Sequence, residues 1–314
     1  MKNPFTNFNI DLNNLTCMFI SLKSILEYRK KFTNWTKIIR EIRTNSYPFK
    51  AITRDGQNFT IYGHSQIYFL LKGHNLPDYD QKDKILKINY KGHILEFVNA
   101  LQNGGLFEVF IEEEYAPLNI NGSNVIDIGG NIGDSAIYFA LNGARSVISI
   151  EPQLSSFDSM VRNVALNSMD QQITTVRAGV GKSESYLAVS GSSATADGGM
   201  SLVPDKKGEE MHILDMKYIS KNYLQELNVL KVDCEGCEYD FFDGADLNDL
   251  QKFQRIMVET HYGSKSIIKK LQKAGFEVTF SKGMIGYNTN SKPHIMSTRI
   301  VFAERKANPD HLSE

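Results

Sequence analysis

The sequence has few cysteines, no excess of positive charge and no long apolar run, and each absence excludes a class of protein. Three cysteines in 314 residues do not allow a disulfide framework to be inferred, and an odd count is typical of a reducing compartment. Lysine and arginine number 35 against 36 acidic residues, so nothing favours a nucleic-acid backbone as partner. No apolar run approaches the roughly 18 residues of a membrane span, and no signal-peptide layout is present. We therefore expect a cytoplasmic protein with neither a membrane span nor a nucleic-acid partner.

The composition favours an ordinary α/β protein. Hydrophobic residues make up 41% and charged residues 23% of the chain, enough for a full core and an additional smaller region. From residue 124 onward apolar strand patterns alternate with helical ones, which indicates a Rossmann-like, seven-stranded, mostly parallel, doubly wound sheet. The strands are expected near 124–128, 146–151, 173–180, 228–233, 255–260, 276–281 and 297–304, the last two antiparallel. The helices are expected at 134–142, 154–167, 216–226, 238–243 and 264–274, and the small, polar segment 190–199 is expected to be a mobile surface loop.

The first third of the chain has a different pattern. Residues 15–43 carry helical periodicity, which predicts two helices. Two pairs of short strand-like runs follow, one flanking Asp55-Gly56 and the other flanking Lys91-Gly92. Such dipeptides between strands are hairpin signals. This region is therefore expected to be an N-terminal helix-plus-hairpin subdomain.

A third helix is expected to lead from this subdomain into the core. It covers residues 104–115, and Pro117 is expected to stop it. The predicted organisation is an α+β cap or substrate-side subdomain at 1–115, a core domain at 116–305 and a C-terminal tail at 306–314.

The first core strand runs into a glycine-rich turn. Asp127 lies in the strand, and Gly129, Gly130 and Gly133 follow it. Glycines let a backbone turn sharply and approach a ligand closely. The second core strand ends in Glu151, where doubly wound folds place a carboxylate that accepts hydrogen bonds from ribose hydroxyls. The two segments together predict a nucleoside-cofactor site.

The spacing within the turn favours one cofactor over another. The pattern Asp-x-Gly-x-Asn-x-Gly places Asn131 where dinucleotide-binding proteins have the glycine that makes room for a pyrophosphate. A polar side chain suits an amino-acid head group better, so S-adenosylmethionine is favoured over NAD. The run resembles motif I of class I S-adenosylmethionine-dependent methyltransferases. The cofactor-binding residues expected on this basis are Asp127, Gly129, Gly130, Asn131, Gly133, Asp134, Glu151 and Gly179.

Polar side chains also gather where later strands end. The fourth core strand ends at Asp233, with Glu235 in the following turn, and the fifth delivers Glu259 and His261. Open α/β sheets bind their ligands at this edge. Cys234 and Cys237 form a C-x-x-C pair there, but neighbouring acids oppose redox chemistry and further zinc ligands are missing. We expect the two cysteines to be packing residues beside a functional loop.

Four segments together resemble the FkbM family of methyltransferases: Asp-Ile-Gly-Gly-Asn-Ile-Gly-Asp, Ile-Glu-Pro, Leu-Lys-Val-Asp-Cys-Glu-Gly and Val-Glu-Thr-His. The resemblance covers about residues 104–303 and departs from the family at Gly130, Cys234 and Cys237. It implies methyl transfer from S-adenosylmethionine, usually to a hydroxyl of a small molecule, sugar or lipid-like acceptor.

Hydroxyl acceptors must lose a proton, and several residues are suited to this step. His261 is a candidate base because its unperturbed pKa lies near neutrality, and Asp233 or Glu235 could orient it or act instead. A divalent cation held by Asp233, Glu235 or Glu259 is another route. The sequence does not choose between these routes, so the predicted catalytic residues are Asp233, Glu235 and His261, with no committed metal ligand.

Three alternatives stay open. An NAD-dependent dehydrogenase is disfavoured by Asn131, and a nucleobase N-methyltransferase by the Asp-Cys-Glu-Gly run that follows the fourth strand. A non-catalytic protein with the same fold is the third. The expected partner is a small-molecule or carbohydrate acceptor, and a homo-oligomer is possible.

Overall fold

The computed structural model describes residues 22–101, 105–189, 208–281, 284–288 and 294–305, which form two compact units. The larger unit comprises Gly63–Gly286 and Met296–Glu314, and the smaller comprises Met1–Tyr62 and Tyr287–Ile295. The predicted loop at 190–199 and the predicted tail at 306–314 lie outside the described residues.

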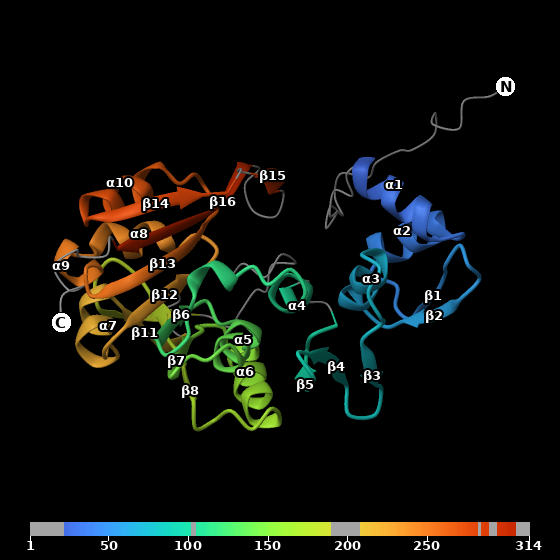
Figure 1. Cartoon of the computed structure of the whole chain (residues 1–314), viewed down its shortest axis with the longest axis horizontal. Coiled ribbons are helices and arrows are strands. Elements are labelled where there is room, and N and C mark those ends of the chain that lie inside the picture. The colour runs from blue at the N-terminus through green and yellow to red at the C-terminus, as the bar shows by residue number, and fades with distance from the viewer. Residues whose placement is uncertain (1–21, 102–104, 190–207, 282–283, 289–293, 306–314) are drawn as a thin grey trace, which may run out of the picture. The chain divides into compact units, whose positions relative to one another are not determined.

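The larger unit is built on one sheet whose strand order is β14-β16-β13-β12-β6-β7-β8, with β15 paired to β16 (Figure 1). The five strands from β13 to β8 are parallel, while β16 runs antiparallel to both β13 and β14. The bounds are β6 Asn124–Ile128, β7 Ser146–Ile150, β8 Ile173–Val176, β12 Asn228–Val232, β13 Phe253–Thr260, β14 Phe276–Phe280, β15 Met284–Asn288 and β16 His294–Arg305. The predicted mostly parallel, Rossmann-like sheet with an antiparallel edge is confirmed.

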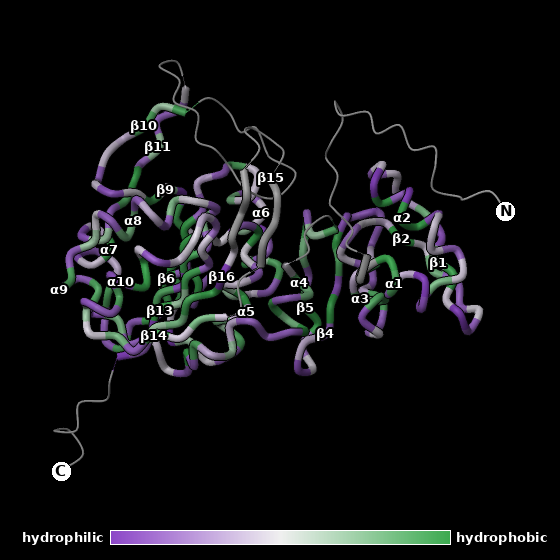
Figure 2. Tube along the Cα trace, turned by 90° about the horizontal axis from the view of Figure 1, so that it is seen from above, coloured by the Kyte–Doolittle hydropathy of each residue, from purple (hydrophilic) through white to green (hydrophobic). Residues whose placement is uncertain are grey.

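Helices cover both faces of this sheet because successive strand residues point to opposite sides. On one face Val125 and Val229 pack with the helices α4, α5 and α6, and on the other Ile126 and Leu230 pack with α7, α8 and α10. Figure 2 shows the apolar stretches concentrated along the central strands. The bounds are α4 Gly105–Phe110, α5 Asp134–Leu141, α6 Leu154–Leu166, α7 Met216–Asn222, α8 Glu238–Gly244, α9 Leu247–Leu250 and α10 Lys265–Lys273.

The helix expected at 104–115 is wrong in its length. It ends at Phe110, where its buried apolar face stops, and Glu113 then adopts a positive φ of 49° that no helix allows. Pro117 does not stop this helix but lies inside a separate 3-10 turn, η1 Ala116–Leu118.

The strand expected at 173–180 is also wrong in part, because it divides between two sheets. Its first half is β8, and its end is β9, Gly179–Val180, which pairs with β11, Glu209–Leu214. Strand β10, Ser185–Val189, pairs antiparallel with β11 and completes a three-stranded sheet. Nothing in the sequence analysis anticipated this small sheet.

The second predicted hairpin belongs to the larger unit. Strands β3 Asp78–Asp80, β4 Ile85–Tyr90 and β5 His93–Val98 form a three-stranded antiparallel sheet, and β5 packs against α6. Helix α3, His64–Leu71, precedes them. The compact units thus divide after Tyr62, whereas the substrate-side role of the first 115 residues stays a prediction.

The smaller unit contains the predicted helices and the first predicted hairpin. They are α1 Leu22–Lys31, α2 Trp35–Arg43, β1 Phe49–Ile52 and β2 Asn58–Ile61. In the described ranges of both units, every helix is too short or too polar to cross a bilayer.

Candidate active site

The glycine turn joins β6 to α5 at the carboxyl edge of the main sheet. Gly129 and Gly133 adopt φ values of 78° and 88°, and Asn131 between them has a φ of 45°. Gly129 also lies against the loop that follows β12, since a Cβ at this position would stand 1.7 Å from the carbonyl oxygen of Asp233. The turn and that loop therefore touch through their backbones.

Glu151 follows β7 and faces the same turn. Its Oε2 accepts a hydrogen bond from the backbone N–H of Asn131 at 2.9 Å, and its Oε1 accepts one from the N–H of Gln153 at 2.8 Å. Burial raises the pKa of the Glu151 carboxyl, although these two hydrogen bonds oppose the shift. Each oxygen retains a further lone pair for a ligand hydroxyl.

Asp127 and Lys231 form a buried ion pair beneath the turn. They lie opposite each other on the adjacent parallel strands β6 and β12, with 3.1 Å between Nζ and Oδ1. Ser135 and Ser149 donate hydrogen bonds to the other carboxylate oxygen at 2.8 and 2.7 Å, and Lys231 also donates to the Gly129 carbonyl at 2.9 Å. Burial opposes the charge on Lys231, but the carboxylates of Asp127 and Asp233 outweigh it and raise its pKa. The lysine thereby ties β12 to the glycine turn.

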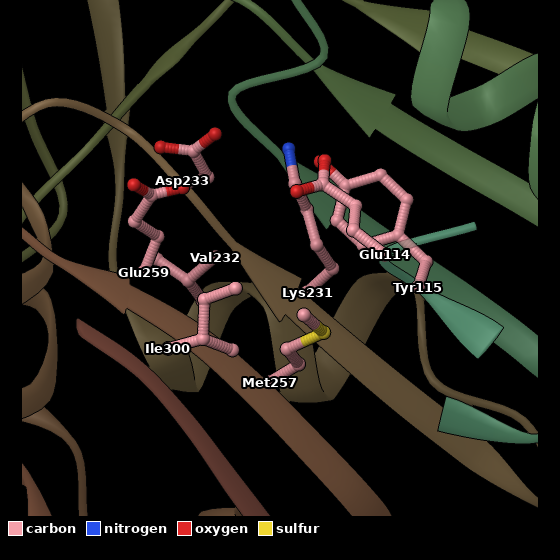
Figure 3. A pocket seen from close by; sticks show the side chains of 8 residues that line it. All are labelled: Glu114, Tyr115, Lys231, Val232, Asp233, Met257, Glu259 and Ile300. Carbon is pink, nitrogen blue, oxygen red and sulfur yellow. The ribbon is translucent and has the colours of Figure 1, made fainter. Parts of the chain in front are cut away.

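A small pocket of about 10 Å³, enough for about one water molecule, lies beside this pair at the ends of β12 and β13. Figure 3 shows Lys231, Glu114 and Tyr115 on one side of it and Asp233 with Glu259 on the other. Burial and the charge of Glu108 raise the pKa of Glu114 to about 7. Burial and the charge of Asp233 raise the pKa of Glu259 to about 8. The residues that line the pocket are Glu114, Tyr115, Lys231, Val232, Asp233, Met257, Glu259 and Ile300.

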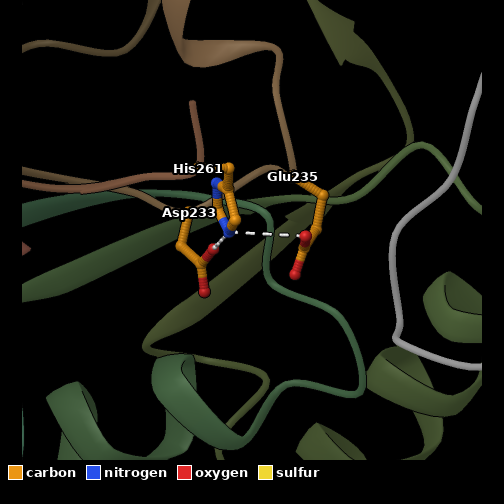
Figure 4. A group of neighbouring side chains, drawn as sticks. All are labelled: Asp233, Glu235 and His261. Atoms are coloured by element: carbon orange, nitrogen blue, oxygen red, sulfur yellow. Dashed lines mark ion pairs between the residues drawn. The ribbon is translucent and has the colours of Figure 1, made fainter. Parts of the chain in front are cut away.

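His261 lies at the end of β13 with its ring almost fully buried. Its Nδ1 lies 3.0 Å from Oε1 of Glu238, a completely buried carboxylate that also accepts the backbone N–H of His261 at 3.0 Å. Its Nε2 faces the loop after β12, 3.3 Å from Oε2 of Glu235 and 3.7 Å from Oδ1 of Asp233 (Figure 4). Three carboxylates thus surround one imidazole.

These carboxylates decide the charge of the imidazole. Burial lowers the pKa of His261, but the hydrogen bond with Glu238 and the charges of Glu235 and Asp233 outweigh it and raise the pKa to about 9. The ring is therefore a cation at neutral pH. The sequence suggested His261 as a base from the ordinary pKa of histidine, and these carboxylates raise the pKa of the ring above that value.

The two cysteines of the C-x-x-C pair are bonded to each other. A disulfide joins Cys234 to Cys237, with 5.5 Å between their Cα atoms. The expectation that they are packing residues beside the loop holds, because both pack against the core, but the bond between them was not anticipated. The acidic neighbours were expected to suppress thiolate chemistry, but they do not prevent the tight turn at Gly236 from bringing the two sulfurs together. The bond closes the loop that carries Glu235.

The structure brings most of the predicted residues into two adjacent groups. Seven of the predicted cofactor residues belong to the glycine turn and its surroundings: Asp127, Gly129, Gly130, Asn131, Gly133, Asp134 and Glu151. Asp134 begins α5, and burial raises its pKa to about 6. Asp233, Glu235 and His261 form the second group, in which each residue offers an atom that could coordinate a metal ion. Gly179 lies instead in β9, where it pairs with Ile213.

Several residues of this site were missed by the sequence analysis, among them Glu114 in the pocket lining, Lys231 and Glu238. Lys231 had a signal, because it is the one charged residue in the otherwise apolar run from Val229 to Val232, and fully buried parallel strands are nearly all apolar. Glu238 had none, because surface acids are common at the start of a helix.

The chain is similar to known methyltransferases over part of its length. Residues 127–278 match the methyltransferase FkbM domain, which confirms the predicted resemblance. "Methyltransferase 1" of Beauveria bassiana is 25% identical over 178 residues, which cover 48% of this chain and 70% of that protein. "Methyltransferase sdnD" of Sordaria araneosa is 22% identical over 210 residues, which cover 55% of this chain and 81% of that protein.

Similar solved structures include TrmK of M. capricolum in complex with S-adenosylhomocysteine. It has a TM-score of 0.41 at 11% identity and covers 64% of this chain and 70% of that one. A tRNA methyltransferase of M. jannaschii has a TM-score of 0.39 at 12% identity and covers 71% of this chain and 57% of that one.

Proposed function

Because residues 127–278 carry a methyltransferase FkbM domain, we propose that this methyltransferase uses S-adenosylmethionine to methylate a hydroxyl oxygen of a small molecule, sugar or lipid-like acceptor. The observation that carries the proposal is the contact between Gly129 and Asp233. Through this contact the glycine turn and the acid-lined pocket lie side by side, at the edge where open α/β sheets bind ligands.

The residues of the glycine turn fit the proposed cofactor. Glu151 has two acceptor oxygens next to the turn, as a pair of ribose hydroxyls requires. Oδ1 of Asp127 is buried, and its one close partner is the ammonium group of Lys231, with which it forms an ion pair but no hydrogen bond. This oxygen can therefore accept a hydrogen bond from the ammonium group of the cofactor. When bound, S-adenosylmethionine supplies an activated methyl group on a sulfonium. The chain's own task is then to align the acceptor oxygen and exclude water.

The carboxylates of the pocket favour an acceptor that donates hydrogen bonds. Asp233 lines it together with Glu114 and Glu259, whose pKa values of about 7 and about 8 leave them partly protonated at neutral pH, and a carboxyl group in either state has an oxygen that accepts a hydrogen bond. A hydroxylated acceptor satisfies them, whereas an acceptor that carries phosphate or carboxylate groups is repelled.

The same carboxylates can remove the hydroxyl proton. Asp233 and Glu259 lie at the pocket together, and the raised pKa of Glu259, about 8, suits a group that takes up a proton near neutral pH. As long as no ion is bound, His261, as a cation, holds Asp233 and Glu235 in position. This assignment narrows the predicted roles, in which His261 was itself a candidate base.

Calorimetry on the full chain tests the cofactor. We would titrate S-adenosylmethionine, S-adenosylhomocysteine and NAD into the wild type, Glu151→Gln and the control Glu209→Gln, whose carboxylate pairs with Arg177 on the surface. Hydrogen bonds to a charged group contribute about 1.5–3 kcal/mol, so Glu151→Gln should weaken binding of the first two ligands about 10- to 150-fold. The control should bind like the wild type.

Each of the other outcomes would favour a different function for the protein. Binding of NAD alone would replace the proposal with a dehydrogenase, and binding of none of the three would favour a non-catalytic protein. If the cofactor binds, a screen of sugars and hydroxylated small molecules with labelled methyl donor tests the acceptor class, and Asp233→Asn should lower turnover more than cofactor affinity.

A further inference from the structure

We propose that Asp233, Glu235 and His261 bind one divalent cation of the kind that accepts mixed nitrogen and oxygen ligands, such as Mn²⁺ or Zn²⁺. The three residues come from the loop after β12 and the end of β13, next to the pocket. The binding of the ion is independent of the methyl donor, and only its use on an acceptor oxygen rests on the proposed function.

The spacing of the donor atoms fits a shared ion. Ligand atoms about 2.1 Å from one ion lie roughly 3–3.5 Å apart when they are adjacent in its coordination shell. Nε2 of His261 lies 3.3 Å from Glu235 and 3.7 Å from Asp233, and all three donor atoms lie within 4.8 Å of one another. Figure 4 shows both carboxylates turned toward the same ring nitrogen. The two carboxylates are about one-third exposed and can rotate the remaining distance.

Glu238 prepares the histidine to be a ligand. Its buried carboxylate accepts the Nδ1 hydrogen of His261, which fixes the ring and leaves Nε2 directed at the other two carboxylates. Histidines that bind metal ions commonly donate their second ring hydrogen to a carboxylate in this way, because the contact sets the tautomer and the orientation. Glu238 is held in turn by the backbone N–H of Gly236 at 2.7 Å.

The loop that supplies the two acids is also fixed. The backbone N–H of Asp233 donates to the carbonyl of Ile128 at 3.0 Å. Glu235 and Gly236 adopt φ values of 54° and 119°, inside the loop that the Cys234–Cys237 disulfide closes. Ligands on a constrained loop lose little conformational entropy when an ion binds.

The charge around the group independently points to a cation. Negative side chains outnumber positive ones around Asp233, Glu235 and His261. One nearby cation, Lys231, is already paired with Asp127, and the other is His261 itself. The carboxylates are Glu114, Asp233, Glu235, Glu238 and Glu259. A divalent ion would add positive charge among these acids.

Binding of the ion is balanced by loss of one proton. The imidazolium of His261 releases its Nε2 hydrogen to solvent, and the nitrogen lone pair then coordinates the ion with one oxygen each from Asp233 and Glu235. A nitrogen ligand with two carboxylates suits Mn²⁺ or Zn²⁺ better than Mg²⁺ or Ca²⁺, which prefer oxygen ligands. Asp233, Glu235 and His261 would hold the ion, and Asp233 also lines the pocket, so the ion would supply Lewis-acid polarisation to a hydroxyl oxygen bound beside it.

Mn²⁺ titration of the EDTA-treated full chain tests the site without any methyl donor. Free Mn²⁺ is measured by electron paramagnetic resonance, with Zn²⁺ as competitor. We expect one Mn²⁺ per chain. The Kd for Mn²⁺ should rise at least roughly 10-fold in Asp233→Asn and in Glu235→Gln, because loss of a residue that binds the ion should cost more than loss of a residue that only supports such a ligand. Matched controls are Asp243→Asn, an acid paired with Lys182, and His212→Gln, a histidine paired with Glu184.

A second measurement guards against misfolding of the variants. Mn²⁺ should broaden the imidazole NMR signals of His261 in the wild type but leave those of His212 sharp. The proposal is overturned if millimolar Mn²⁺ and Zn²⁺ do not bind, or if both acid variants bind them like the controls. Since cofactor binding is measured separately with Glu151→Gln, failure here would leave the proposed function standing.

Discussion

Removal of the buried lysine should be among the most damaging single changes in the larger unit. Lys231 and Asp127 have side chains that are 2% and 0% exposed, with 3.1 Å between their charged atoms. In Lys231→Met the carboxylate would stay in the core without its cation, and the Gly129 carbonyl would lose its donor. Breaking such a pair from one side typically costs about 3–5 kcal/mol, because the remaining charge is neither hydrated nor paired.

This loss is large enough to measure by urea denaturation or by heating. For a unit of this size each kcal/mol lowers Tm by about 2–4 °C, so we expect a decrease of roughly 6–20 °C. The control is Lys182→Met, which removes a lysine that lies 2.6 Å from Asp243 but is 64% exposed. Exposed pairs contribute at most about 1 kcal/mol, so this variant should unfold close to the wild type.

A double-mutant cycle separates the ion pair from the loss of a large side chain. Asp127→Asn combined with Lys231→Met should lose less stability than the two single changes added together, by at least about 2 kcal/mol. If the single changes add to within about 0.5 kcal/mol, the residues are not coupled. That result, or a Lys231→Met variant as stable as Lys182→Met, would refute the reasoning.

Two further predictions concern the pocket and the turn. The folded-state pKa of Glu259 is raised from 4.5 to about 8, so its contribution to stability is present below pH 4.5 and is lost as the pH rises through 8. The free energy of unfolding should decline less over this range in Glu259→Gln, and an unchanged decline would contradict the assignment. In Gly130→Ala the new Cβ would lie 2.0 Å from Oγ of Ser149, at a cost of about 1–3 kcal/mol. The same change should cost less in a Ser149→Ala background, and equal costs in both backgrounds would show that this contact is not the obstacle.

The main sheet, apart from β15, could be predicted because its strands carry their own patterns. The strands at 124–128 and 228–232 are continuous apolar runs with a charged residue at or near one end, as buried parallel strands require. The small sheet of β9, β10 and β11 could not be predicted from the sequence. The segments β10 and β11 are separated by about twenty residues, and each is exposed at its start and buried only toward its end, so neither carries the alternation that marks a strand.

The site shows the same division between local and non-local information. The glycine turn and Glu151 were found because their spacing along the chain carries their chemistry. The charge of His261 could not be found, because it depends on Glu238, which is 23 residues away in the sequence and in contact only after folding. The disulfide was missed for a related reason, since the acidic neighbours of the cysteines were weighed while the turn at Gly236 was not.

The approach of Gly129 to the carbonyl of Asp233 also bears on how such an enzyme can diversify. Any side chain at position 129 would push the loop after β12 out of place, and any shift of that loop inward would displace the glycine turn. Neither segment can be exchanged alone with a homologue, so a chimera would have to carry both. The side chains of the pocket wall that lie away from this contact, such as Met257 and Ile300, are where natural variation and directed evolution have room to change acceptor preference.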